Sequence, residues 1–281
     1  MAAEGNVVGR RPPLDPRLFT ENPARDSRFL VRDRWIECAS FPPDDPRRSV
    51  EFLHRQMNEE VNGLEASAQS LCDFPEADWD IRMGLARQCS DEARHAAMFR
   101  RLLERRGGHV GQYPVLNFQY RIISRIGTLV GRLNIQNRSF EAGGIDAIES
   151  GIGHARDAGD RDLAEFFEIQ LADEIQHVRF ANEAIRALTK RDPRSLLHMG
   201  AALTAAEEAF AEVMGKEGTE GARRPVASQA RSEAGFTERE ITIAGDLASV
   251  VGAGQAGKPG PEVPGEPRSA GGRGPSGEPS G

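Results

Sequence analysis

The sequence lacks any long hydrophobic run. No window of its 281 residues approaches the roughly 18 uninterrupted apolar residues of a membrane span, and the N-terminus has no apolar signal core. Cysteine is also rare: Cys38, Cys72 and Cys89 are an odd number without CxxC spacing, which indicates neither a disulfide framework nor a zinc knuckle. We therefore expect a soluble, cytoplasmic protein with no membrane partner, whose cysteines are reduced and buried.

Positive charge is in deficit. The chain has 36 Lys and Arg against 43 Asp and Glu, for a net charge of −7. Binding to nucleic acid phosphates normally needs a basic surface, so nucleic acid is an unlikely main partner. Arginine pairs such as Arg47/Arg48 and Arg100/Arg101 keep that option open, but solvated helix faces explain them better.

Strand patterns are scarce too. Alternating runs of Val, Ile, Thr and aromatic residues between turn residues are missing, so we predict an all-α fold. Residues 252–281 contain ten Gly and six Pro, with Val263 as the only large aliphatic residue. A segment of that composition cannot bury enough surface to offset its ordering entropy. We predict a disordered tail over 251–281, and an extension over 1–44 that lies on the domain surface.

Helical periodicity and helix end signals divide the rest of the chain. Asp45-Pro46 and Asp160 are typical helix starts, and Gly107-Gly108 is a typical helix end. The four long predicted helices run over about 45–71, 76–106, 121–158 (bent near Gly131) and 160–190, with a long connection over 107–120. A fifth helix is predicted to about 216, and a short one over 237–249. We predict a four-helix bundle with one long crossover and a fifth helix over 45–216, followed by a C-terminal segment over 217–250.

One motif occurs twice. Asp91-Glu92-Ala93-Arg94-His95 returns 82 residues later as Asp173-Glu174-Ile175-Gln176-His177. Glu60 lies 32 residues before Glu92, and Glu141 lies 33 residues before Glu174. On a helix, positions i and i+3 share a face, so each Glu-x-x-His pair can reach one point. Such a repeat is typical of di-iron and di-manganese bundles. The predicted metal ligands are Glu60, Glu92, His95, Glu141, Glu174 and His177.

Chance does not explain this repeat. With 27 Glu and 6 His in the chain, about 0.6 Glu-x-x-His matches are expected, and three occur. The third match, Glu51 to His54, lacks both the preceding Asp and an upstream Glu helix, and we interpret it as the chance occurrence.

Charge and ligand type indicate which metals would bind. Each unpaired carboxylate in a dry interior costs several kcal/mol, so four of them call for cations, and two divalent ions cancel their charge. Oxygen and imidazole ligands without thiolate suit iron or manganese better than a structural zinc site. We therefore expect two iron ions, with manganese as the alternative metal.

Several assignments stay open. Asp91 and Asp173 are interpreted as carboxylates that orient a ligating His, with plain surface acids as the alternative. Helical phase favours Glu60 as the first ligand, but its neighbours Glu59 and Glu65 compete with it. Glu149 is a weaker rival of Glu141.

Gly143 and Gly144 are an unusual pair inside a helix, where each costs about 1 kcal/mol relative to Ala. They indicate either room for a ligand, and so a weakly supported substrate pocket, or close helix packing. Three aromatic residues, Tyr113, Tyr120 and Trp79, are candidates to lie near the site.

At these motifs the chain resembles the ferritin-like superfamily. It is most similar to a bacterial ferritin-like family of unknown function, over residues 45–245. That family's Glu-Ala-x-Gly-Leu-Asp motif resembles Glu141-Ala142-Gly143-Gly144-Ile145-Asp146, and its C-terminal signature resembles Ala230-Arg231-Ser232-Glu233-Ala234-Gly235-Phe236. The chain departs from the family at Asn58-Glu59-Glu60, where the family has His before the ligand Glu. A more distant resemblance is to the di-iron hydroxylase that modifies an isopentenylated adenosine in tRNA.

The motifs and the resemblance together predict a non-haem di-iron or di-manganese oxidoreductase. It would activate dioxygen to hydroxylate or oxidise a small organic substrate, with an electron donor as a further partner and a homodimer as one option. The alternative is an iron-binding or peroxide-scavenging protein without an organic substrate. An RNA-modifying hydroxylase and a metal-free scaffold carry lower weight.

Overall fold

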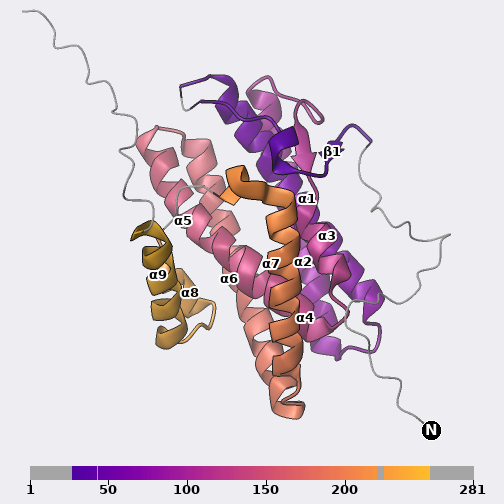
Figure 1. Cartoon of the computed structure of the whole chain (residues 1–281). Helices are drawn as coiled ribbons and strands as arrows, with labels where there is room; N and C mark the ends of the chain where they lie inside the picture. Colours follow the sequence, from indigo (N-terminus) through magenta and orange to yellow (C-terminus); the bar gives the residue numbers. More distant parts are fainter. Residues whose placement is uncertain (1–26, 43, 220–224, 254–281) are drawn as a thin grey trace, which may run out of the picture.

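The protein is an all-α helical bundle, as the sequence predicts (Figure 1). The computed structural model describes residues 27–42, 44–219 and 225–253. Within them the long helices are α1 (Arg47–Asp73), α2 (Trp79–Arg105), α5 (Ala142–Asp157), α6 (Arg161–Arg191) and α7 (Ser195–Thr219). The shorter helices are α3 (Phe118–Arg125), α4 (Leu129–Ile135) and α8 (Ser228–Glu233), and α9 (Glu238–Ala253), which is as long as α5, follows α8. The predictions for 1–26 and for the tail beyond 253 lie outside the described residues.

The core has two apolar ends and a polar middle. Leu53, Phe99 and Phe166 belong to the cluster at one end of the bundle. At the other end Leu85 and Ile185 pack with residues of α4. On α1, α2 and α6 the residues between these clusters include buried Glu and His side chains. A polar band therefore crosses the bundle between two hydrophobic layers that shield it from water.

The third predicted helix is not continuous, which corrects the predicted span of 121–158. It is divided into α3, α4, a π-helix (Gln136–Glu141) and α5, with a break at residues 126–128. The buried Arg132 stabilises the break, because its Nε donates to the Ile126 carbonyl at 2.8 Å. A Cβ on Gly131 would lie 2.8 Å from Ile126 Cγ2, so the glycine permits the tight approach of the chain at this point. The expected bend near Gly131 is therefore a full interruption.

The crossover between α2 and α3 contains a strand that the sequence did not indicate. β1 (Leu30–Arg32) pairs in parallel with β2 (Pro114–Leu116). Three-residue strands are too short to show an alternating pattern, which is why they escaped prediction. Side chains of α1 hold the crossover: Asn58 Nδ2 donates to the Leu116 carbonyl at 2.6 Å.

His54 also anchors the crossover, and its surroundings predict a pH effect. Its Nε2 accepts from the Gly111 amide at 2.9 Å. Burial, with a smaller contribution from His109, lowers the pKa of His54 from 6.5 to about 4. Between these two values the unfolded chain binds a proton that the folded chain does not, so stability should fall as the pH drops from 6.5 towards 4.

Thermal unfolding across this range tests the effect. His54→Gln keeps an acceptor for Gly111 but does not titrate, so its unfolding temperature should fall less steeply than that of the wild type. The exposed His154, replaced in the same way, is the control and should leave the slope unchanged. Equal slopes for wild type and His54→Gln would contradict the assignment.

The cysteines correct one prediction. All three are free thiols, but Cys72 is exposed and Cys38 and Cys89 are only half-buried. Cys72 lies in the last turn of α1 on the side that faces solvent, whereas Ser70 and Asp73 of the same turn are buried. None of the helices in the described part combines the length and the apolar character needed to cross a membrane.

Candidate metal centre

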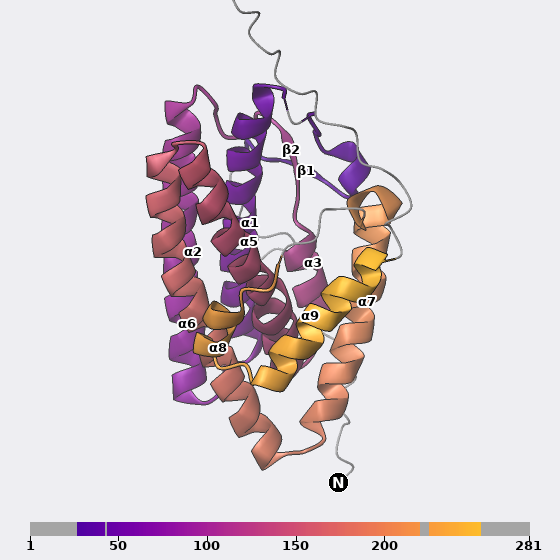
Figure 2. The ribbon, with the colours of Figure 1, turned by 90° about the vertical axis from the view of Figure 1, so that its left-hand side faces the viewer.

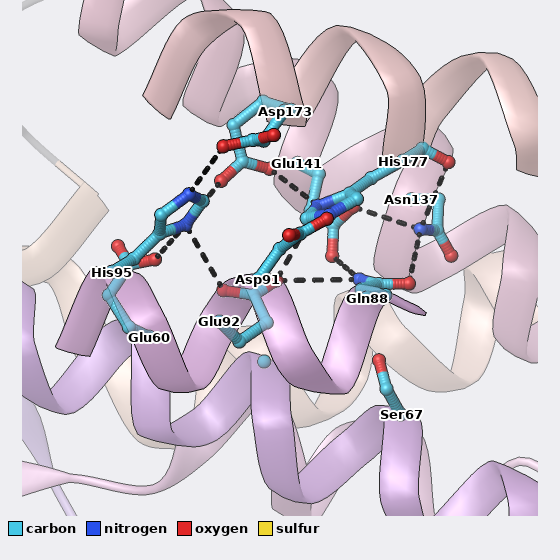
Figure 3. A network of polar contacts seen from close by, with 12 residues as sticks. Glu60, Ser67, Gln88, Asp91, Glu92, His95, Asn137, Glu141, Asp173 and His177 are labelled. Atoms are coloured by element: carbon cyan, nitrogen blue, oxygen red, sulfur yellow. Dashed lines mark hydrogen bonds and ion pairs between the residues drawn. The ribbon is translucent and has the colours of Figure 1, made fainter. Parts of the chain in front are cut away.

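All six predicted ligands meet in the polar band of the bundle (Figure 3). They form two groups, in each of which the ligand atoms lie within 4.8 Å of one another. Site A comprises Glu60, Glu92, His95 and Glu174, and site B comprises Glu92, Glu141, Glu174 and His177. Glu92 and Glu174 belong to both. Among the described residues, these clusters are the ones that can hold a metal ion.

The two imidazoles face the carboxylates through the same ring atom. His95 Nδ1 lies 3.2 Å from Glu60 Oε2 and 3.6 Å from Glu174 Oε1. His177 Nδ1 lies 3.3 Å from Glu174 Oε2 and 3.8 Å from Glu141 Oε2. The Nδ1 atoms are therefore the ones placed to bind a cation.

The aspartates of the two motifs are exchanged between the histidines. His95 Nε2 lies 3.1 Å from Asp173 Oδ2, and His177 Nε2 lies 3.2 Å from Asp91 Oδ2. Each Asp thus contacts the His of the other motif rather than its own. A carboxylate that binds one ring nitrogen fixes the orientation of the imidazole and leaves the other nitrogen as the one that can bind a metal. Burial opposes the charge of His177, but hydrogen bonds to Asp91 and Glu174 outweigh it and raise the pKa of His177 well above its usual value, so a metal would displace a proton from its Nδ1.

Arg94 joins the two aspartates on the outer side of the histidines. Its Nη2 donates to Asp91 Oδ1 at 3.0 Å and to Asp173 Oδ2 at 2.6 Å. Hydrogen bonding to His177 lowers the pKa of Asp91 well below its usual range, and Arg94 adds to the effect although burial opposes it. Asp91 is therefore ionised and able to hold the imidazole at neutral pH.

The carboxylates of the centre carry an excess of negative charge. Burial raises the pKa of Glu60 and of Glu92 well above the usual value, and repulsion by Glu174 adds to it. Burial also raises the pKa of Glu141. Such shifts mean that the folded chain cannot keep all four carboxylates charged without added cations. The donor set thus fits divalent metals.

Carboxamide side chains surround the carboxylates, and sequence reasoning did not assign them to the site. Gln170 Nε2 donates to Glu60 Oε1 at 2.9 Å, and Asn137 Nδ2 donates to Glu141 Oε2 at 2.9 Å. Gln88 donates to Glu141 as well. The Oδ1 of Asn137 and the Oε1 of Gln170 are buried acceptors that lack a donor. The available signal was their spacing: Asn137 lies four residues before Glu141 and Gln170 four residues before Glu174, so each shares a helical face with a predicted ligand.

The π-helix positions the fourth carboxylate. It ends at Glu141, and its residue Gln136 donates from Nε2 to Ser67 Oγ at 2.8 Å and to the Gly63 carbonyl at 3.3 Å. An i→i+5 turn inserts one residue into a helix, so the side chains before the turn are rotated about the helix axis relative to those after it. Both Asn137 and Glu141 face the centre across this turn.

Gly63 is a further residue that sequence reasoning missed. A Cβ at this position would lie 2.8 Å from Cδ and 2.9 Å from Oε1 of Glu92. Gly63→Ala should therefore turn the shared carboxylate away and weaken metal binding at both sites, by about tenfold, while adding up to about 1 kcal/mol of helix propensity. Metal titration combined with thermal unfolding measures both effects.

Gly153→Ala is the matched control for that variant. Gly153 lies inside α5, and nothing lies within 4 Å of the Cβ that it would gain. It should show the gain in stability without the loss of affinity. If Gly63→Ala bound metal as tightly as the wild type, the absence of a side chain at Gly63 would not be what positions the Glu92 carboxylate.

The competing candidates lie away from the centre. Glu59 accepts from Gln119 Nε2 at 3.0 Å, and neither Glu59 nor Glu65 belongs to either site. Glu149 is exposed. In the third Glu-x-x-His match, Glu51 pairs with Arg55 at 2.9 Å and His54 holds the crossover.

The predicted aromatic neighbours do not reach the site. Trp79 is 71% exposed, Tyr113 packs edge-on against His54, and Tyr120 donates to Gln69. Nothing lies within 4 Å of the Cβ that Gly143 or Gly144 would gain, so close helix packing does not explain these two glycines. The substrate pocket beside them stays a prediction.

A pocket does reach the centre from another side. It has a volume of about 150 Å³ and lies between α2 and α6, lined by Gly84, Arg87, Gln176, His177 and Phe180. Phe180 lies so close to α2 that a Cβ on Gly84 would be 2.2 Å from its ring. Of the six ligand residues only His177 lines this pocket.

Comparison with known proteins gives one match. A protein-family model described as "Protein of unknown function (DUF455)" matches residues 9–242. No curated protein and no solved structure matches the chain.

Proposed function

Because the chain belongs to the family described as "Protein of unknown function (DUF455)", we propose its function from the chemistry of the centre: a non-haem di-iron oxidoreductase that activates dioxygen, with manganese as the alternative metal. The observation that best supports this proposal is that sites A and B share Glu92 and Glu174. Two ions held by common carboxylates would lie next to each other, as in the ferritin-like di-metal proteins that the two motifs resemble.

The protein's own residues would supply geometry and proton control. Asp91 and Asp173 fix the imidazole rings through Nε2, so that each Nδ1 points at the carboxylates. The carboxamides of Gln88, Asn137 and Gln170 hold the carboxylates in place. Iron bound here would supply one-electron chemistry with dioxygen. The apolar layers on both sides of the polar band would exclude bulk water.

The substrate would be a small organic molecule. The pocket beside His177, which is partly open to solvent, has a volume of about 150 Å³, enough for a molecule about the size of benzene. Oxygenation would also require an electron donor. An RNA substrate is less favoured, because the chain has a net charge of −7.

Burial favours a second candidate, an iron-binding or peroxide-scavenging protein. His95 is 0% exposed and Glu92 is 3% exposed. The pocket touches the outer edge of one ligand only, so a molecule in it would not meet both metals directly. A small oxidant needs less space than an organic substrate, and for this candidate no organic molecule has to reach the centre.

Metal content tests both candidates. After loading with ferrous iron in air and removal of excess metal, the wild type should retain about two ions per chain. His95→Ala combined with His177→Ala should lose them while keeping its helical content. His54→Gln, in the third Glu-x-x-His match, should retain them. Less than about one ion per chain in the wild type would overturn the proposal.

Oxygen consumption then separates the two candidates. If loaded protein consumes oxygen only when a small organic molecule is added, the oxygenase is supported. Oxidation of ferrous iron or removal of peroxide without any organic molecule supports the second candidate.

A further inference from the structure

The C-terminal α8–α9 segment is attached to α5, which begins directly after the site B ligand Glu141, and to α6, which bears the site B ligands Glu174 and His177. Ala230 and Ala234 pack with Ala142 and Ile145 of α5 and with Val178 of α6 in one buried apolar cluster. Figures 1 and 2 show α8 against α6, with α9 beside α8 on the outer side of the bundle. This attachment is remote in sequence from Glu141, and the proposed metal chemistry does not explain it.

An ion pair joins α8 to α5. Arg231 Nε donates to Asp146 Oδ1 at 2.9 Å, and its Nη2 donates to Asp146 Oδ2 at 2.7 Å. Nη2 also donates to the Ala142 carbonyl at 3.2 Å, one residue after Glu141. The Asp146 side chain is only 11% exposed, and it also accepts from the Ala227 amide at 2.9 Å. A two-pronged guanidinium–carboxylate contact of this kind fixes orientation as well as distance.

Side chains of α6 hold the other end of α8. The last carbonyls of a helix have no partner within the helix. Here Arg179 Nε donates to the Glu233 carbonyl at 2.7 Å, and Asn182 Nδ2 donates to that of Ala234 at 2.8 Å. Gly235 follows with a φ of +86°, a conformation that favours glycine at the end of a helix. The position of α8 on α6 is therefore fixed by specific bonds.

A second ion pair reaches the π-helix itself. Arg138, three residues before Glu141, pairs through Nη2 with Glu240 Oε1 of α9 at 2.5 Å. The Phe236 ring lies against two guanidinium groups, 5.0 Å from Cζ of Arg138 and 5.4 Å from Cζ of Arg231. Burial opposes the charge of Glu240, but hydrogen bonds from Thr237 and Arg138 outweigh it and lower the pKa of Glu240 to about 2. This pair therefore stays charged at neutral pH.

The contacts converge on the turns around Glu141. Arg138 precedes it, Ala142 follows it, and Asp146 lies one turn further along α5. A π-helix is rare and occurs mostly as a single-turn bulge inside an α-helix, frequently at a functional site, so the contacts on this one bear directly on Glu141. Glu141 is a ligand of site B only, whereas Glu60 is a ligand of site A only.

We propose that the C-terminal segment is a clamp, formed by Arg231, Phe236 and Glu240 on Asp146 and Arg138, that holds the π-helix so that Glu141 completes site B. Arg231 and Glu240 are positioning residues: they act through Glu141 and touch no ligand atom. The inference rests on the proposed function, because it takes sites A and B to hold metal.

Stepwise metal binding tests the clamp. Cobalt(II) added to the full-length, metal-free protein should give two tight equivalents in the wild type, followed by its visible absorption and by equilibrium dialysis. Arg231→Gln and Glu240→Gln should each keep one tight equivalent and bind the other about tenfold more weakly. This is the lower end of the roughly ten- to hundredfold loss expected when a residue that orients a metal ligand is replaced. Arg231→Lys, which keeps the charge, should restore part of the loss.

A double-mutant comparison shows whether the effect passes through Glu141. In a Glu141→Gln background, Arg231→Gln should cause no further loss of cobalt, whereas in a Glu60→Gln background it should weaken the remaining site. Arg156→Gln is the control, because Arg156 pairs with Glu168 at 2.6 Å and also joins α5 to α6, but far from the π-helix. It should bind two equivalents.

Three outcomes would overturn the clamp: two unchanged equivalents in Arg231→Gln, equal weakening of both, or additive losses in the Glu141→Gln background. Absence of cobalt binding in the wild type would instead count against the proposed function. The clamp is then decided by amide hydrogen exchange at residues 136–141 of the metal-free chain. Exchange should be about tenfold faster in Arg231→Gln than in the wild type, and an equal rate would overturn the clamp.

Discussion

Replacing Glu174 by glutamine should abolish tight binding of both metal ions, whereas Glu60→Gln should remove one and leave the other. Glu174 belongs to sites A and B, so its loss takes one ligand and one negative charge from each. Residues that merely orient a ligand are worth about ten- to a hundredfold in affinity, so loss of a shared ligand should cost at least about a hundredfold at each site. Glu92→Gln should behave like Glu174→Gln, and Glu141→Gln like Glu60→Gln.

Metal per chain after loading at a fixed free metal concentration measures this pattern. Glu59→Gln is the matched control, because Glu59 precedes Glu60 and faces Gln119 instead of the centre. It should retain both ions. If Glu174→Gln still binds two, or if Glu60→Gln binds none, the assignment of shared and unshared ligands is wrong.

The largest expected effect on stability lies at the far end of the bundle, at Arg132. Its Nη2 pairs with Asp73 Oδ2 at 2.5 Å, and the two side chains are 1% and 0% exposed. Arg132→Met leaves Asp73 as a buried charge without this partner, which typically costs about 3–5 kcal/mol. Urea unfolding of the two proteins under the same metal-free conditions gives the difference.

The double variant Arg132→Met with Asp73→Leu should recover much of that loss, because apolar pairs of similar volume often replace buried ion pairs at little cost. Arg121→Met is the surface control. Arg121 pairs with Asp33 at 3.2 Å, and the Asp33 side chain is 84% exposed, so its loss should cost less than about 1 kcal/mol. A similar small loss in Arg132→Met would mean that water reaches Asp73.

The repeated motif, the spacing of the upstream glutamates and helical phase together predicted the six residues of the centre. Each of Glu92, His95, Glu174 and His177 lies on a regular helix, where i and i+3 must face the same way. Phase with Leu53 and Met57 also selected Glu60 over Glu59 and Glu65, and the structure places Glu60 alone of the three in a site.

Irregular backbone and contacts between distant segments could not be predicted in this way. The π-helix before Glu141 adds a residue to a turn, and a pattern that assumes a constant period has no means of showing it. The break before α4 depends on Arg132, a charged residue that a periodic pattern assigns to the surface. Gly63 is identified only by the Glu92 carboxylate that approaches it from another helix.

The contact between Asp146 and the C-terminal motif could not be predicted from the sequence either. Asp146 and Arg231 are 85 residues apart, and only the folded chain shows that they form one contact. In the sequence each segment only resembled a motif of a known family, and the physical link between the two is a property of three-dimensional packing.

The exchange of aspartates between the two histidines makes the internal repeat indivisible. A fragment limited to α1 and α2 would contain Glu60, Glu92 and His95, yet the carboxylate that orients His95 comes from α6. Neither helical hairpin is therefore a complete metal-binding module. If the repeat arose by duplication of one hairpin, its ancestor had to associate with a second copy before either imidazole acquired its aspartate.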